Sequence, residues 1–408
     1  MKKVWDKWTR IALVKRILVG LILGAILGIA VPQATGIAIL GDVFVSALKA
    51  IAPLLVFFLV ISSLCNAGKS HGGVIKTVII LYMFSTVLAA VIAVFASMAF
   101  PVKMTLANAA TDTSAPQGIV EVLNNLLLNV VANPVSSLVN ANYVGILMWA
   151  VLLGLAFRAA DKMTKKVLAD VADGISMVVT WIINLAPFGI FGLVFNTVST
   201  NGLDIFTTYG KLLLLLVGCM LFIYFVTNPL LVYWCIRQNP YPLIFHCLKR
   251  SALTAFFTRS SAANIPVNMK VCEEMGLDRD TYSVTIPLGA TINMDGAAIT
   301  ITVMTMATAF TLGIHVDIPT AIILSLLAAL SACGASGVAG GSLLLIPMAC
   351  SLFGISDDIS MQVVAVGFII GVVQDSVETA LNSSSDLLLS ASAEFRQWRL
   401  EGEEIKFK

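Results

Sequence analysis

The chain has 408 residues, of which 58% are hydrophobic and only 12% are charged. A soluble domain carries about 25% charged residues, so this composition excludes an ordinary water-soluble fold. The formal net charge of +2 comes without a basic cluster interleaved with aromatic side chains, which argues against a nucleic-acid partner. We therefore expect an all-α polytopic membrane protein, embedded in the lipid bilayer.

Seven cysteines and three histidines give no sign of a disulfide framework or a metal centre. The cysteines are scattered through apolar segments without paired Cys-x-x-Cys spacing, and the histidines lie far apart in the sequence. Isolated cysteines of this kind behave as small buried hydrophobes. We expect no organic cofactor and no transition metal.

Apolar runs of roughly membrane-spanning length follow one another along the chain. The basic start, Met1–Trp8, leads directly into the first run, which we interpret as a retained membrane helix. A spanning helix needs about 20 apolar residues, and most runs approach that length. The runs are Ile11–Val31, Val43–Cys65, Thr77–Phe100, Tyr143–Phe157, Ile175–Val198, Leu212–Ile236, Ser283–Ile314, Ile318–Phe353 and Met361–Ser392.

The first run contains Gly20, Gly24 and Gly28 at four-residue spacing. Small residues at this spacing let two membrane helices approach closely, so they indicate a packing face, although such glycines are frequent in membrane helices. The one long polar connection, 101–142, lies between the third and fourth runs.

Lysine and arginine residues orient the predicted helices. Six basic residues precede Ile17, whereas the connections at 32–42, 315–319 and 354–360 contain none. The positive-inside rule then makes both termini cytoplasmic. That requires an even number of complete crossings, and eight fits the apolar runs best.

Two segments, 241–269 and 330–347, are apolar, then small and polar, then apolar again. This pattern predicts re-entrant helical hairpins, whose non-helical tips are tolerated only inside protein or beside water. A hairpin followed by an interrupted helix occurs twice, because 241–269 precedes 283–314 and 318–353 precedes 361–392. With the charge bias, the two hairpins enter from opposite sides. This predicts an inverted repeat with a binding site near the bilayer midplane.

A polar stripe runs through the last apolar run. At 100° per residue, five side chains fall within about 100° of the helix surface: Asp375, Glu378, Thr379, Asn382 and Asp386. A solvated helix face explains this stripe poorly, because the other face and the flanks are apolar too. Ionisable groups inside a membrane are costly and by default indicate a functional site.

Polar residues also interrupt the run Ser283–Ile314, within Pro287–Gly296. Asn293 and Asp295 favour unwound backbone, which frees carbonyl oxygens such as that of Gly289. Carboxylate, amide and carbonyl oxygens suit a hard cation and not a soft transition metal. The alternative is a polar kink that only packs helices, but the oxygen donors of the stripe favour a cation site.

Five motifs occur together in this chain: Arg259-Ser260-Ser261, Asn293-Met294-Asp295-Gly296, Gly334-Ala335-Ser336-Gly337-Val338, the set Asp375, Thr379, Asn382 and Asp386, and Leu185–Phe191. Together they resemble the dicarboxylate/amino acid:cation symporters, the glutamate-transporter family. The resemblance extends over nearly the whole chain. Within the family it is greatest to the bacterial sodium/serine-threonine symporters.

The resemblance implies a homotrimer in the bacterial inner membrane, in which a transport domain moves against a scaffold like an elevator. Each subunit would have eight transmembrane helices and two re-entrant hairpins around an inverted-repeat core. The scaffold would comprise residues 1–75 (helices 1 and 2) and 101–210 (an extracellular linker with helices 4 and 5). The transport domain would comprise 76–100 (helix 3) and 211–395, before a cytoplasmic tail at 396–408. Residues 211–395 would form helix 6, hairpin 1 (241–270), broken helix 7 (283–314), hairpin 2 (318–353) and helix 8 (359–395).

The resemblance also implies three sites for co-transported sodium ions. One would use Tyr82, Ser85, Thr86, Asn293 and Asp295. A second would use Gly289, Asn293, Asn382 and Asp386, and a third Thr291 with backbone oxygens of Ala332, Cys333 and Ala335. For the hydroxyls of the third run, the alternative is that they bond back to their own helix.

Contacts to an amino-acid substrate would come from Ser260, Ser261, Val338, Asp375, Glu378, Thr379 and Asn382. The chain departs from the family pattern most clearly at Glu378, where members that transport acidic substrates carry arginine. Smaller departures are Ala262, Ala297 and Ala339. The acidic residue argues against a dicarboxylate substrate.

Arg259 is expected to pair with an intramembrane carboxylate, either Asp375 or Glu378, because an unpaired arginine inside the protein would be costly. Glu378 is expected to face the substrate and to exclude acidic side chains by like-charge repulsion. The alternative is that Glu378 only neutralises Arg259.

The predicted function is secondary transport, in which inward sodium flux drives uptake of L-serine and L-threonine. Proton coupling, and other substrates such as alanine, small neutral amino acids or dicarboxylates, remain alternatives. A channel is disfavoured because the polar groups cluster at one depth and form no pore-lining rings. An enzyme with Ser260 or Ser261 as nucleophile is disfavoured because no histidine or lysine base accompanies them in the tip segment.

Overall fold

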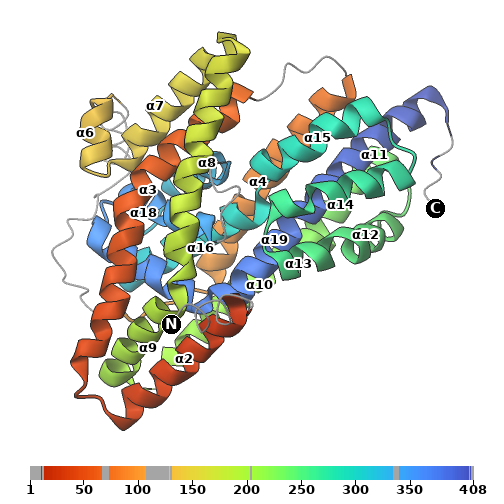
Figure 1. The fold of residues 1–408 in the computed structure, drawn as a ribbon. Coiled ribbons are helices and arrows are strands. Elements are labelled where there is room, and N and C mark those ends of the chain that lie inside the picture. Colours follow the sequence, from red (N-terminus) through yellow and green to blue (C-terminus); the bar gives the residue numbers. More distant parts are fainter. Residues whose placement is uncertain are drawn as a thin grey trace.

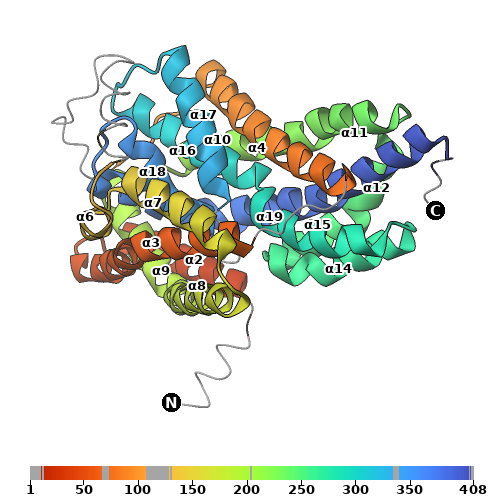
Figure 2. The same ribbon diagram turned by 90° about the horizontal axis from the view of Figure 1, so that it is seen from above.

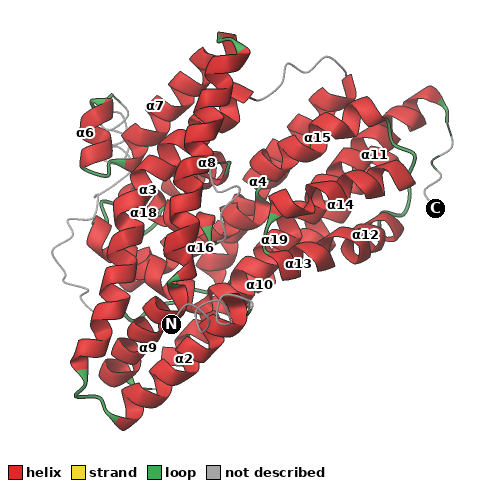
Figure 3. Ribbon diagram, in the orientation of Figure 1, coloured by secondary structure: helices red, strands yellow, loops and turns green. Residues whose placement is uncertain are grey.

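The computed structural model describes residues 11, 13–66, 73–106, 128, 131–202, 205–333, 340–403 and 405. Within these residues the fold is helical throughout and contains no strand (Figure 3). Six described stretches are helical, long and apolar enough to cross a membrane: Thr35–Asn66, Gly73–Ala99, Lys162–Asn184, Phe206–Ile236, Arg279–Thr311 and Asp357–Glu401. The expected class is confirmed, and the chain is an all-helical polytopic membrane protein.

Two groups of helices lie side by side (Figure 1). The first group contains α2 (Leu13–Ala30), α3 (Ile39–Asn66), α7 (Tyr143–Ala156), α8 (Lys162–Asn184) and α9 (Ala186–Asn201). Figure 2 shows these helices together on one side, with α4, α10, α11, α12, α15 and α17 on the other. Short helical turns η1 (Thr35–Ala38) and η2 (Phe157–Ala159) connect members of the first group.

The second group is built around α19 and contains the remaining long helices. In chain order its members are α4 (Gly73–Ala99), α10 (Ile205–Phe222), α11 (Asn228–Ile236), α12 (Tyr241–Cys247), α13 (Leu253–Thr258), α14 (Ser261–Glu274), α15 (Arg279–Ile292), α16 (Asp295–Thr311), α17 (Ile318–Ala332), α18 (Ile346–Ser351) and α19 (Asp357–Glu401). Two π-helical turns, η3 (Ile223–Thr227) and η4 (Leu248–Ala252), and the 3₁₀ turn η5 (Gly341–Leu345) complete it.

α19 is one continuous helix of 45 residues. The expectation of an interrupted helix within 361–392 is therefore wrong. Many of its polar side chains bond to carbonyls of the preceding turn, as Ser384 does to Ala380, so they do not compete for the helical N–H groups. The helix is predominantly buried and contacts α4, α9 and most members of the second group, which makes it the centre of the fold.

Three helices begin with the same aspartate cap. The carboxylates of Asp161, Asp278 and Asp317 each accept a hydrogen bond from the backbone N–H of a threonine three residues later, at 2.7, 3.0 and 2.9 Å. Such caps satisfy N–H groups that the first helical turn leaves free. Hydrogen bonds from the threonines hold the pKa of these carboxyls below the usual aspartate range.

The structure adds detail to two predicted segments. The run 175–198 is divided between α8 and α9, because the helix breaks at Leu185 before Pro187, and α8 already begins at Lys162. The polar connection 101–142 also contains a short helix, α6 (Pro134–Val139), capped by the Asn133 side chain. A prediction from apolar runs misses these helix starts because the first turn and its cap are polar.

The glycine spacing of the first run is confirmed as a packing face. α2 lies against α9, and a Cβ atom added to Gly24 would lie 2.6 Å from the carbonyl oxygen of Phe191. At Gly28 the distance to the Phe195 carbonyl oxygen would be 3.0 Å, and at Gly20 the added atom would overlap Pro187. Only glycine permits this approach of two backbones.

We expect Gly24→Leu to lower the free energy of unfolding by about 1–3 kcal/mol, the usual cost of overpacking. The Phe191 carbonyl belongs to the backbone and cannot rotate away from the added side chain. Thermal unfolding of the purified protein in detergent would measure it. Gly174→Leu is the matched control, because no atom lies within 4 Å of a Cβ added at that helical position. Equal unfolding midpoints for both variants would contradict the packing role.

Candidate functional site

The predicted interruption of the run 283–314 is confirmed. α15 ends at Ile292 and α16 begins at Asp295, while Asn293 and Met294 between them leave helical geometry. A break of this kind exposes backbone groups that must find other partners inside the protein.

Side chains of two other helices satisfy those backbone groups. The N–H of Met294 donates to Thr86 Oγ1 of α4 at 3.3 Å, and the N–H of Gly296 donates to Asn382 Oδ1 of α19 at 2.7 Å. The break is therefore held from both sides, and the predicted polar stripe of α19 meets the predicted break in space.

The carboxylate of Asp295 faces α4 and is fully buried. Ser85 Oγ donates to its Oδ2 at 2.8 Å, and Thr86 Oγ1 lies 3.2 Å from its Oδ1. Thr86 also donates to the Tyr82 carbonyl of its own helix at 2.9 Å. The alternative that these hydroxyls bond back to their own helix therefore holds in part for Thr86 and does not hold for Ser85. The structure thus brings the first predicted sodium set together.

Asp386 lies beside the same break. Asn293 Nδ2 donates to its Oδ1 at 2.9 Å, and the Tyr82 hydroxyl donates to its main-chain carbonyl at 2.8 Å. A Cβ added at Gly289 would lie 2.8 Å from Asp386 Oδ1, so this contact requires glycine. With Asn382 one turn earlier on α19, the second predicted set is also brought together.

Asn293 Oδ1 is buried and accepts no hydrogen bond from any described residue. An unsatisfied buried acceptor costs about 1–3 kcal/mol. The same helix break also holds the carboxylates of Asp295 and Asp386 and the hydroxyl of Ser85. Such an oxygen set fits a hard cation such as sodium, which would satisfy the free acceptor.

The third predicted sodium set is only partly described. Thr291 Oγ1 donates to the Leu288 carbonyl at 2.7 Å, and the Cys333 thiol lies 3.7 Å from the Ile292 carbonyl. The end of α17, including Ala332, therefore lies next to the break. Ala335 lies outside the described residues, as does Val338 of the predicted substrate set.

Arg259 and Asp375 form the ion pair of the candidate substrate site. Arg259 Nε lies 2.6 Å from Asp375 Oδ2, and the two side chains are 12% and 5% exposed. Asp375 Oδ1 accepts the N–H of Gly340 at 3.1 Å. The carboxylate is thus held between the turn after α13 and the segment that precedes η5, which confirms Asp375 as the expected partner of Arg259.

A sharp turn places Arg259 there. Arg259 has φ +53°, a left-handed conformation uncommon outside glycine, and it ends α13. Ser260 then caps α14 by accepting the N–H of Ala263 at 3.2 Å, and Ser261 is its first residue. Residues held in sparsely populated backbone regions cluster at functional sites.

Glu378 does not pair with Arg259, so the alternative that Glu378 only neutralises Arg259 is wrong. Its Oε2 accepts hydrogen bonds from Thr300 Oγ1 at 2.7 Å, Ser342 Oγ at 2.8 Å and Gln374 Nε2 at 2.5 Å. These three neutral donors come from α16, η5 and α19 itself. No local pattern predicted Thr300 or Ser342, because each lies on a different element and is one of many hydroxyl residues.

A second polar cluster, also missed from the sequence, joins α14 and η4 to α19. Asn264 Nδ2 donates to Ser383 Oγ at 2.8 Å, Asn268 Nδ2 donates to the Ser383 carbonyl at 2.8 Å, and Ser251 Oγ donates to Asn268 Oδ1 at 2.5 Å. The four-residue spacing of the two asparagines in a predicted hairpin was the available signal. This cluster fixes the helices that present Arg259.

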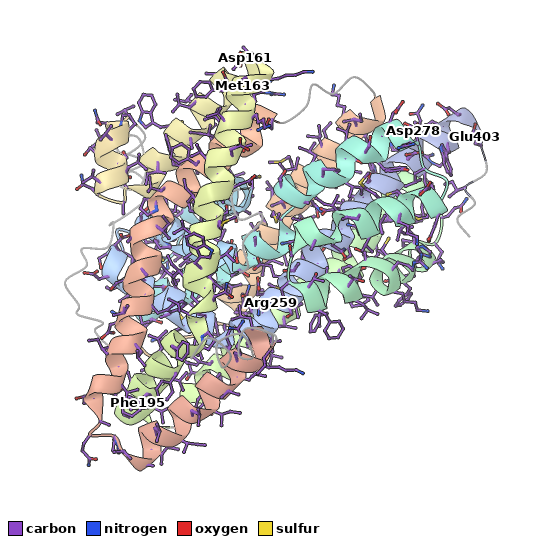
Figure 4. All side chains as sticks on the ribbon, viewed as in Figure 1. Asp161, Met163, Phe195, Arg259, Asp278 and Glu403 are labelled. Atoms are coloured by element: carbon purple, nitrogen blue, oxygen red, sulfur yellow. The ribbon has the colours of Figure 1, made fainter. Side chains whose placement is uncertain are left out.

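Arg259 lies near the middle of the molecule, far from Asp278 and Asp161 at its ends (Figure 4). A cavity of about 10 Å³ adjoins the Arg259–Asp375 pair and is lined also by Ile17 and Ala186 of the first helix group. That volume corresponds to about one water molecule. The candidate site therefore lies where the two helix groups meet.

Buried oxygen donors at a helix break, beside a charged pair at a helix–helix turn, are typical of ion-coupled membrane transporters. The Sodium:dicarboxylate symporter family matches residues 13–394, and the chain belongs to this family. The resemblance found in the sequence is thereby confirmed.

Two relatives match along nearly their whole length. The chain is 57% identical over 406 residues to a protein of Bifidobacterium adolescentis named serine/threonine transporter SstT, covering 99% of this chain and 94% of that protein. It is 55% identical over 400 residues to a protein of the same name from Streptococcus thermophilus, covering 98% and 100%.

We expect Arg259→Ala and Asp375→Ala to be strongly non-additive. Breaking a buried pair from one side leaves an uncompensated charge and costs about 3–5 kcal/mol, whereas removing both partners costs less than the sum. Unfolding of the purified single and double variants in detergent would give the coupling energy. The control cycle, Arg259→Ala with Glu378→Ala, should show much smaller coupling. Purely additive losses for Arg259 and Asp375 would disprove the pair.

Proposed function

We propose that the chain is a secondary transporter that couples inward sodium flux to the uptake of L-serine and L-threonine. The observation that carries the proposal is the charge balance at the helix break. Within the described residues, the buried carboxylates of Asp295 and Asp386 receive only neutral donors, and the Asn293 carbonyl receives none. A transported sodium ion would supply the missing positive charge.

The two described oxygen sets would bind separate ions. Ser85 and Thr86 contact the Asp295 carboxylate, whereas Asn293 and Gly289 adjoin the Asp386 carboxylate. The Tyr82 hydroxyl contacts the main-chain carbonyl of Asp386. Because Asn293 belongs to both sets, binding of one ion orients the amide for the next. Thr291, with backbone oxygens of Ala332, Cys333 and Ala335, would hold a third ion.

The amino-acid substrate would bind at the junction of the two helix groups. Its ammonium group would bind Asp375, a carboxylate matched to a cation. The substrate carboxylate would accept hydrogen bonds from Ser260 and Ser261, at the turn between α13 and α14, and from Asn382. Arg259, at the same turn, stays paired with Asp375. Thr379, Val338 and Glu378 would contact the substrate side chain.

The architecture would follow the family. We propose eight crossings, with hairpin 1 formed by α12 to α14 and hairpin 2 by α17, η5 and α18, and with both termini cytoplasmic. The first helix group would be the scaffold, within 1–75 and 101–210. The second group would be the mobile transport domain, 76–100 and 211–395, before the tail 396–408. A homotrimer in the bacterial inner membrane would hold the scaffolds together.

Uptake into vesicles of purified protein tests the function. An inward sodium gradient should drive saturable accumulation of labelled serine and threonine, and dissipating the gradient should abolish it. A panel with alanine, aspartate and a proton gradient distinguishes the alternative substrates and coupling ions. Lack of sodium-dependent serine or threonine uptake by folded protein would refute the proposal.

Asp386→Asn and Asn293→Ala should each raise the half-saturating sodium concentration at least about tenfold, about 1.4 kcal/mol of binding free energy, because each removes charge or an oxygen from a desolvated cation shell. Sodium titration of serine uptake measures this. Ser392→Ala on the same helix is the control, because its hydroxyl only bonds back to the Leu388 carbonyl. An unchanged sodium dependence in both test variants would remove these residues from the cation site.

Glu378 should exclude acidic substrates. A like charge in a low-dielectric pocket costs several kcal/mol, so aspartate should compete poorly with labelled serine in the wild type. Glu378→Gln should keep serine transport and permit aspartate to compete. Glu378→Arg should favour aspartate, and it leaves Arg259 its partner Asp375.

Competition of labelled serine by aspartate in the wild type and both variants measures this selectivity. Thr300→Val is the matched control, because it removes a donor to Glu378 without changing the charge. Strong competition by aspartate in the wild type would end this assignment of Glu378.

A further inference from the structure

A groove of about 670 Å³ lies between α10 and the end of α4, away from the candidate transport site. Ligand sites have volumes of about 300–1,000 Å³, so the groove is large enough to hold a molecule. Phe100 and Val102 line it at the end of α4, and Leu214 and Phe222 line it on α10. Its lining is apolar except for one charged residue, Lys211.

The groove lies on the outer surface of a membrane-spanning stretch. Phe100, Leu214 and Phe222 are 68%, 74% and 47% exposed, and α10 belongs to the apolar span Phe206–Ile236. Apolar side chains this exposed on a spanning helix face lipid. The groove therefore opens to the hydrocarbon core and not to water.

The groove has the length of one leaflet. Lys211 and Phe222 are eleven residues apart on one helix, which corresponds to about 16 Å along its axis. The hydrocarbon core is about 30 Å thick, so this distance is about half of it. Lys211 lies near the start of α10, where a long basic side chain extends to the headgroup level.

Lys211 makes no hydrogen bond or ion pair with any residue in the part of the chain that the structure describes. An ammonium group next to an apolar groove at the membrane surface complements an anionic headgroup. The floor of the groove is also open, because no atom lies within 4 Å of a Cβ added at Gly218.

We propose that this groove is a binding site for an anionic phospholipid. One acyl chain lies along α10 from Lys211 to Phe222, and the phosphate of the headgroup pairs with Lys211. The charge at one end and the one-leaflet length select a lipid over a second copy of the chain, whose contact would need no cation there. Because α4 also carries Ser85 and Thr86, a lipid bridging α4 and α10 stabilises the helix that binds Asp295.

Native mass spectrometry of the purified full chain, titrated with phosphatidylglycerol or phosphatidylethanolamine, tests the site. The wild type should bind phosphatidylglycerol more tightly and should unfold at a higher temperature with it. Lys211→Gln should weaken phosphatidylglycerol binding about fivefold, the effect of one surface cation. It should weaken phosphatidylethanolamine binding less, because the ammonium group of that lipid already offsets the charge of its phosphate. Gly218→Phe fills the groove and should abolish the tight site for both lipids.

Two controls match these variants. Lys103→Gln removes an exposed lysine near the same end of α4 that does not line the groove, and Gly174→Phe adds a phenyl ring at an open helical position of α8. Both should bind lipid as the wild type does.

Equal binding of the two lipids by the wild type, an equal loss in Lys103→Gln, or tight binding retained in Gly218→Phe would overturn the proposal. A Gly218→Phe variant that dissociates into smaller oligomers would instead identify a second copy as the occupant, and would overturn it too.

Discussion

A carboxylate buried in a membrane protein must be matched by partners from other helices, and this constraint organises the second helix group. Asp375, Glu378 and Asp386 lie along α19, and each draws a different element to it: the turn after α13, then α16 with η5, then the break between α15 and α16. Since an unmatched carboxylate there would be severely destabilising, these contacts decide which helices pack on α19 and in what register.

The kind of partner differs from one carboxylate to the next, and this difference separates the proposed roles. Asp375 has a cationic partner within the chain, so it exists as an ion pair that an ammonium group can join or replace. Asp295 and Asp386 meet hydroxyl and amide groups within the described residues, which solvate a negative charge without neutralising it. Under the proposed function, a sodium ion would supply the missing positive charge. Glu378 resembles these two in its neutral donors, and under the proposed function it would face the substrate.

The two helix groups are held together internally by different forces. In the first group, glycines bring the backbones of α2 and α9 into direct contact, which leaves no room for rearrangement. In the second group, hydrogen bonds between side chains, such as those of Asn264 and Asn268 to Ser383, join short helices and turns to α19. At the junction between the groups, the cavity beside Arg259 is small and Ile17 and Ala186 are apolar. The proposed movement of one group against the other would take place at this junction.

Local sequence determined the membrane class of this protein and several features of individual helices. The apolar runs determine the membrane class, and the four-residue spacing of Gly20, Gly24 and Gly28 determines a close packing face. Asn293 and Asp295 beside Gly296 unwind their own helix, because their side chains compete with the backbone at short range. Periodicity likewise places Asp375 and Asp386 on one face of α19. The tertiary structure alone decided that Arg259 pairs with Asp375 and not Glu378, that Thr300 and Ser342 bind Glu378, and that α19 stays unbroken. Those outcomes depend on the relative placement of helices far apart in the chain, and spacing within one helix carries no information about that placement.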